Sequence, residues 1–254
     1  AFDADAVTAA LADYTGKAAT GMQAETAHSR QLLWAALMST ARDRALAAIL
    51  AGNAAQASDW LTIRDYARAS GDTAAALAVQ ALGAGTLDAQ AAHDTVAGEL
   101  LTVAASELRL ALTRARDDAA AGHMIQYAGD LGRIEGLAAY LGPNLADHLG
   151  ADGQAALSQA LARAATDAQA LVQIDALLAG YAPVALSPEE TLRRARLLRR
   201  FTALVWEEYK DGVRGGEISQ PMEYHEARLF RDRAAMILGD LAPQMADPAQ
   251  AAKL

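Results

Sequence analysis

FTALVWEEYKDGVRGGEISQPMEYHEARLFRDRAAM, residues 201–236, has the pattern of two helices joined by a glycine turn. Three glycines fall within five residues, at Gly212, Gly215 and Gly216, and each would cost a continuous helix about 1 kcal/mol. Pro221 suits the first turn of a new helix, because its missing N–H has no intrahelical partner there. The stretch therefore predicts a helical hairpin, and we expect Tyr209 and Tyr224 to be core anchors on either side of its loop.

Acidic side chains gather around this loop. They are Glu207, Glu208, Asp211, Glu217, Glu223 and Glu226. Glu223 and Glu226 are three residues apart, so they share one helix face. If the two helices pack antiparallel, their loop ends meet, and Glu208 or Asp211 approaches this pair.

Two interpretations of these acids follow. Hard cations such as Fe³⁺, Ca²⁺ or Mn²⁺ prefer oxygen ligands, and His225 adds a nitrogen ligand suited to iron or zinc. Carboxylates in the first turn after a proline also offset the helix dipole and satisfy free N–H groups, which gives Glu223 and Glu226 a purely structural role. We predict a metal site with Glu223 and Glu226 as its main ligands, and with Glu208, Asp211 and His225 as lesser candidates.

The composition predicts an all-α protein. Hydrophobic residues make up 53% of the 254 residues but aromatic residues only 5%, because alanine supplies much of the apolar count. Alanine loses no side-chain entropy in a helix, and β-branched residues almost never alternate here as they do in strands. We expect an up-and-down antiparallel bundle of eight or nine helices, forming one domain over residues 1–254 with a possible internal boundary near 142–153.

Capping residues, glycines and prolines set the expected helix limits. The helices are expected at about 3–14, 22–50, 60–69, 73–82, 87–120, 124–141, 152–178, 188–211 and 221–241. Gly142-Pro143 is predicted to end the sixth of these helices.

Charge and residue types exclude several functions. The net charge of −9 argues against a nucleic-acid partner, which needs a concentrated basic face. The basic cluster Arg193, Arg194, Arg196, Arg199 and Arg200 is instead predicted to be a solvated helix face. The chain has no cysteine, no phosphate-binding glycine loop and no nucleophile motif, so we expect no enzyme. We also expect no membrane-spanning segment, because no uncharged apolar run of 18 residues occurs.

The spacing around the hairpin resembles that of a known family. Bacterial iron permeases of the FTR type have a helical region ahead of their membrane part with the pattern Tyr-x3-Val-x2-Gly-x6-Glu-Tyr-x-Glu-x3-Phe. The matching residues are Tyr209, Val213, Gly216, Glu223, Tyr224, Glu226 and Phe230. The match covers about 30 residues without a gap, and a weaker similarity lies at 60–66.

This resemblance implies a soluble, exported helical protein that takes part in iron uptake at the periplasm or cell envelope. The implied cargo is an iron ion, and the implied partner is a membrane iron permease or another envelope protein. The first residues, Ala1-Phe2-Asp3, fit an end left after signal-peptide removal, although a chain trimmed for other reasons would begin in the same way. The alternative is a structural or interaction module of the envelope without metal function.

Overall fold

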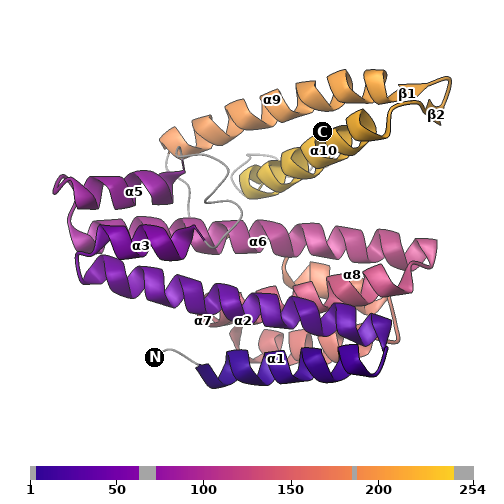
Figure 1. The fold of residues 1–254 in the computed structure, drawn as a ribbon, viewed down its shortest axis with the longest axis horizontal. Helices are drawn as coiled ribbons and strands as arrows, with labels where there is room; N and C mark the ends of the chain where they lie inside the picture. Colours follow the sequence, from indigo (N-terminus) through magenta and orange to yellow (C-terminus); the bar gives the residue numbers. More distant parts are fainter. Residues whose placement is uncertain (1–3, 63–72, 185–187, 243–254) are drawn as a thin grey trace. The chain divides into compact units, whose positions relative to one another are not determined.

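A computed structural model describes residues 4–62, 73–184 and 188–242 of the chain (Figure 1). Contacts between Cα atoms divide the chain into two compact units, Ala1–Ala179 and Gly180–Leu254. Almost all described residues are helical, so the predicted all-α bundle fold is confirmed. The division lies at 179/180 rather than near the suggested boundary at 142–153.

The first unit contains seven described helices. They are α1 (Ala4–Ala19), α2 (Gln23–Leu50), α3 (Ala54–Leu61), α5 (Ala74–Gly83), α6 (Ala89–Ala121), α7 (Met124–Ala164) and α8 (Ala170–Leu177). Helix α2 packs on α7 and α6, α1 packs on α2, and α5 packs on α6. Leucines and isoleucines of α6 and α7, such as Leu108, Ile134 and Leu141, are fully buried between these helices.

Glycines bring α2 and α7 unusually close together. A Cβ atom on Gly132 would lie 2.4 Å from the carbonyl oxygen of His28, and one on Gly136 would lie 2.6 Å from the Cβ of Ala35. Beside this contact, Arg133 binds Glu107 of α6 at 2.7 Å and stacks 4.3 Å above the ring of Trp34 of α2. Arg133 therefore links three helices, and small residues allow the close packing that this link requires.

The predicted helix end at Gly142-Pro143 is confirmed, because the helical run of α7 is interrupted at Gly142 and again at Gly150, whose backbone angles are not helical (φ 31° and 66°). Two other predicted helix limits of the first unit are wrong. The predicted helix over 152–178 is broken at 165–169, where the Asp167 side chain accepts a hydrogen bond from the N–H of Gln169 at 2.9 Å. Helix α3 starts at Ala54, capped by the Asn53 side chain, rather than near residue 60. Most of the helix predicted over 60–69 lies outside the described residues.

The second unit is the predicted helical hairpin. Its elements are α9 (Pro188–Gly212), β1 (Val213–Arg214), β2 (Glu217–Ile218) and α10 (Pro221–Leu241). The predicted glycine turn is a small antiparallel β-ribbon, in which Val213 faces Ile218 and Arg214 faces Glu217. Gly215 and Gly216 form its two-residue loop with φ angles of 63° and 85°, the left-handed values that a type I′ turn requires.

Aromatic and charged side chains of α9 and α10 meet in the seam between the two helices. Phe201 stacks on Phe230 with ring centroids 5.9 Å apart, and Ala227 of α10 is buried. Farther from the ribbon, Arg194 forms a buried ion pair with Asp240. The prediction that the whole basic cluster is solvated is therefore wrong for Arg194, because α10 supplies a buried acid opposite it.

Within the described part of the chain, no helix combines the length and the apolar character needed to cross a membrane.

Candidate functional site

Gly212 ties the end of α9 to the start of α10. A Cβ atom on Gly212 would lie 2.7 Å from the backbone nitrogen of Tyr224 and 3.2 Å from the carbonyl carbon of Glu223. The Gly212 carbonyl oxygen also accepts hydrogen bonds from the N–H groups of Ser219 and Gln220 at 2.9 and 3.2 Å. The absence of a side chain at Gly212 thus allows the first turn of α10 to lie directly against α9.

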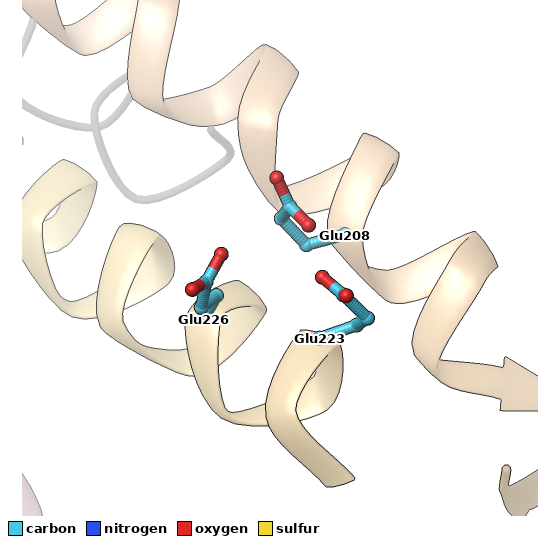
Figure 2. A group of neighbouring side chains, drawn as sticks. All are labelled: Glu208, Glu223 and Glu226. Carbon is cyan, nitrogen blue, oxygen red and sulfur yellow. The ribbon is translucent and has the colours of Figure 1, made fainter. Parts of the chain in front are cut away.

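Three glutamates converge at this contact (Figure 2). Glu208 extends from α9, and Glu223 and Glu226 extend from α10 into the space between the two helices. Each offers one carboxylate oxygen, and these three oxygens lie within 4.8 Å of one another. All three side chains are half-buried, so the site is open to solvent on one side.

The closeness of the three acids changes the proton affinity of Glu208. Its pKa is raised above the ordinary value of 4.5, first because its side chain hydrogen-bonds to Glu223, and further through desolvation. The negative charges of Glu223, Glu226 and Asp211 add to this rise. A proton on Glu208 therefore relieves repulsion between the acids, and a cation placed between them would relieve it in the same way.

The structural interpretation of these acids, stabilisation of the helix dipole, fits one of the glutamates but not the others. Glu223 lies in the first turn of α10, where a carboxylate stabilises the helix dipole. Glu226 lies one turn farther along, and its side chain points towards Glu208 rather than towards the helix start (Figure 2). Dipole stabilisation therefore accounts for Glu223 but not for the convergence of Glu226 and Glu208.

Two of the five candidate ligands do not join this group. Asp211 is exposed and acts on Glu208 through its charge, while its backbone oxygen accepts a 3.4 Å hydrogen bond from the Gln220 side chain. His225 is exposed on α10 and does not belong to the glutamate cluster. The cluster thus consists of Glu208, Glu223 and Glu226.

Two features of the site were not evident from the sequence: the central place of Glu208 and the close contact at Gly212. Glu208 was predicted as a lesser candidate, yet it is the α9 member of the cluster; the seven-residue spacing shared by Phe201–Glu208 and Glu223–Phe230 could have identified it. The close contact at Gly212 leaves no sequence signal beyond a glycine at a helix end. The expectation that Tyr209 is a core anchor is also wrong, because 44% of its surface is exposed.

Each of the two units matches a sequence model of a known protein domain. Residues 1–182 match the sequence model of the iron permease FTR1 N-terminal domain, and residues 187–254 match that of the iron permease-associated 4-helix bundle domain. No curated protein and no solved structure matches the chain. The first match covers more than half of the 254 residues, and the boundary between the matches agrees with the division of the structure near residue 180. The chain therefore belongs to the iron permease FTR1 family.

Proposed function

We propose that the α9–α10 hairpin binds an iron ion through Glu208, Glu223 and Glu226, and that it captures or hands over iron during uptake. The observation that carries the proposal is the convergence of these three carboxylates within 4.8 Å, from two helices, in a chain of the iron permease family. The family relation supports iron as the cargo, and the cluster supplies the oxygen ligands that iron accepts.

A site with three protein ligands suits the transfer of iron better than its storage. Carboxylate oxygens are hard donors, and a hexacoordinate ion held by three of them keeps further positions for water or for a ligand on a receiving protein. The half-buried position of the cluster supports exchange with such a partner. The role that we assign is binding and delivery without catalysis.

The place of action is part of the same proposal. We infer that the protein is exported and works at the periplasm or cell envelope, where its partner is a membrane iron permease or another envelope protein. Fractionation of cells that produce the protein from its native gene tests this location. Recovery of the protein only with the cytosolic fraction would contradict it.

Calorimetry on matched variants tests the metal site. Fe²⁺ under anaerobic conditions and Mn²⁺ as an air-stable probe are titrated into the wild-type chain and into Glu223→Gln/Glu226→Gln. The control is Glu207→Gln/Glu217→Gln, which removes the same charge from exposed positions of the same hairpin. We expect one binding site in the wild type and in the control, and affinity at least about tenfold weaker in the cluster variant, because two of the three charged oxygen ligands are replaced by neutral ones.

Equal binding by both double variants would place the metal elsewhere. If titration of metal into the wild-type chain releases no more heat than titration into buffer alone, the result would favour the alternative function, a structural or interaction module of the envelope.

A further inference from the structure

One face of α9 carries basic and apolar side chains in a single row. Its members follow one another at intervals of three or four residues, the spacing of side chains on one face of a helix. The row consists of Leu192, Arg196, Arg199, Ala203, Trp206 and Lys210, all of which are exposed. Leu192 is 53% exposed and Trp206 is 67% exposed, so the two large apolar side chains lie open to solvent together with the charged ones. We call these six residues the outer row.

The outer row lies on the side of α9 opposite its seam with α10. The two helices run side by side (Figure 1), and Phe201 marks the seam because its ring stacks on Phe230. At about 100° per residue, Arg199 and Ala203 are two positions from Phe201 and therefore point almost directly away from it. Packing against α10 thus leaves the outer row uncovered, and the carboxylate cluster lies on the other side of α9.

The cations of the outer row are not neutralised by acidic neighbours. The row contains no aspartate or glutamate, and within the described part of the chain Arg196, Arg199 and Lys210 form no ion pair. Arg200, also exposed, flanks the row on the same helix. The second unit has as many basic as acidic residues, so the net charge of −9 belongs to residues 1–179 and the row is a positive strip on a neutral unit. Such a strip favours an anionic partner.

The mixture of side chains in the row fits a lipid surface better than an acidic protein. Basic side chains alone suit any anionic partner, but Trp206 adds an indole, the group that prefers the boundary between lipid headgroups and acyl chains. The long arginine and lysine stems beside it lie along apolar surface while their charged ends reach phosphate groups. The row extends straight along α9 for about 27 Å, from Leu192 to Lys210 at 1.5 Å per residue, and a straight ridge matches a flat surface.

We propose that the outer row of α9 binds the surface of an anionic phospholipid membrane. Trp206 and Leu192 enter the headgroup region, and Arg196, Arg199 and Lys210 contact the lipid phosphates. This association needs no metal ion and does not depend on the proposed iron site.

Vesicle co-sedimentation of the full chain without metal tests the proposal. At about 50 mM salt, the wild type is expected to bind vesicles of equal parts phosphatidylglycerol and phosphatidylcholine at least about tenfold more tightly than vesicles of phosphatidylcholine alone. Arg196→Gln/Arg199→Gln is expected to weaken binding to the anionic vesicles at least about tenfold, because each basic side chain at such a surface contributes roughly fivefold. Arg228→Gln/Arg231→Gln removes the same charge from exposed positions of α10 and is expected to change binding less than about twofold.

Tryptophan fluorescence identifies the surface that meets the lipid. Trp34 and Trp60 are less exposed than Trp206 and belong to the first unit. Anionic vesicles that contain brominated acyl chains are expected to quench the wild-type fluorescence. Trp206→Phe is expected to keep most of the binding but to lose this quenching, because the remaining tryptophans stay away from the membrane.

Three outcomes would overturn the proposal. They are a wild type that does not bind anionic vesicles, a variant of the outer row that binds as tightly as the α10 control, and quenching that persists in Trp206→Phe. Release of the bound chain by soluble poly-glutamate at an equal concentration of charge would assign the row to an acidic protein instead of a membrane. Glu223→Gln/Glu226→Gln is expected to bind vesicles as the wild type does, so failure of membrane binding is distinguishable from failure of the iron site.

Discussion

Gly212 and Tyr224 touch through their backbones: a Cβ atom on Gly212 would lie only 2.7 Å from the Tyr224 nitrogen. This contact sets the separation of α9 and α10 where Glu208 faces Glu223 and Glu226. The geometry of the carboxylate cluster therefore depends on a residue that has no side chain.

Gly212→Ala tests this dependence. The added methyl group meets backbone rather than a movable side chain, so the helices must separate, and we expect Mn²⁺ affinity to fall about tenfold with a stability loss of about 1–3 kcal/mol. Calorimetry and urea unfolding measure the two effects. Gly16→Ala in α1 is the control, because its Cβ would have no neighbour within 4 Å; it is expected to leave affinity unchanged and to stabilise the chain slightly. Unchanged affinity in Gly212→Ala would show that the cluster does not need this contact.

Glu208→Gln is expected to change metal-free stability and metal binding in opposite directions. The raised pKa of Glu208 means that the folded chain keeps this proton where the unfolded chain has lost it. The stability that comes from Glu208 is therefore present at low pH and is lost as the pH rises through the raised pKa. We expect Glu208→Gln to raise the metal-free Tm at pH 7.5 but not at pH 3.5, and to reduce the rise in Tm that Mn²⁺ produces.

Differential scanning calorimetry at both pH values, with and without Mn²⁺, measures these changes. Glu207→Gln is the matched control on the same helix. A lower metal-free Tm in Glu208→Gln at pH 7.5 would contradict the repulsion between Glu208 and the neighbouring carboxylates.

From Asp130 in α7 we predict a second dependence of stability on pH, in the first unit. Its pKa is raised from 3.8 to about 6, mainly by burial and further by Asp118, against the opposing charges of Arg114 and Arg133. Stability contributed by protonated Asp130 is thus lost as the pH rises from about 4 to above 6. Asp130→Asn is expected to stabilise the chain by about 1 kcal/mol at pH 7.5, a value reduced because the side chain is partly exposed to solvent. At pH 4 it is expected to have little effect, because Asp130 is then protonated in the folded chain.

Urea unfolding at the two pH values measures the gain from Asp130→Asn. The exposed Asp152→Asn is the control and is expected to change stability by less than about 0.5 kcal/mol. Destabilisation by Asp130→Asn at pH 7.5 would show that the ionised carboxylate is stabilised by its arginine neighbours.

We predict that substitutions in the buried pair Arg194–Asp240 change the stability of the chain non-additively. Arg194→Leu leaves Asp240 buried without this charge partner, so we expect a loss of about 3 kcal/mol. Arg194→Leu/Asp240→Leu is expected to recover most of that loss, because two apolar side chains then fill the site. Circular dichroism in urea measures both variants, and Mn²⁺ binding is expected to survive in the double variant. A double variant no more stable than the single one would indicate that other contacts of these residues dominate.

The sequence predicted the elements whose limits depend on local chemistry. Helix α10 begins at Pro221 and ends at Leu241 as expected, and Gly122 adopts the left-handed conformation that ends α6. These limits were predictable because proline and glycine act on the backbone at their own positions.

Limits that depend on tertiary packing were not predictable. The break at 165–169 contains no glycine or proline, yet it interrupts the helix predicted over 152–178, with Ala164, Ala170 and Leu171 buried on either side of it. Convergence of Glu226 with Glu208 likewise depends on the separation of two helices, which no pattern within one helix specifies. The sequence therefore predicted the acidic hairpin and included the three converging glutamates among its five candidate ligands, while the contact at Gly212 required the structure.

The central claim is that Glu208, Glu223 and Glu226 together hold an iron ion. Anomalous diffraction at the iron absorption edge, from crystals of the wild-type chain grown with Fe²⁺ without oxygen, tests it most directly. We predict an anomalous peak between α9 and α10, about 2.0–2.2 Å from one oxygen of each glutamate, as carboxylates bind first-row metal ions. A fully occupied iron peak elsewhere on the chain, with these three carboxylates bound only to water or to arginine, would contradict the account.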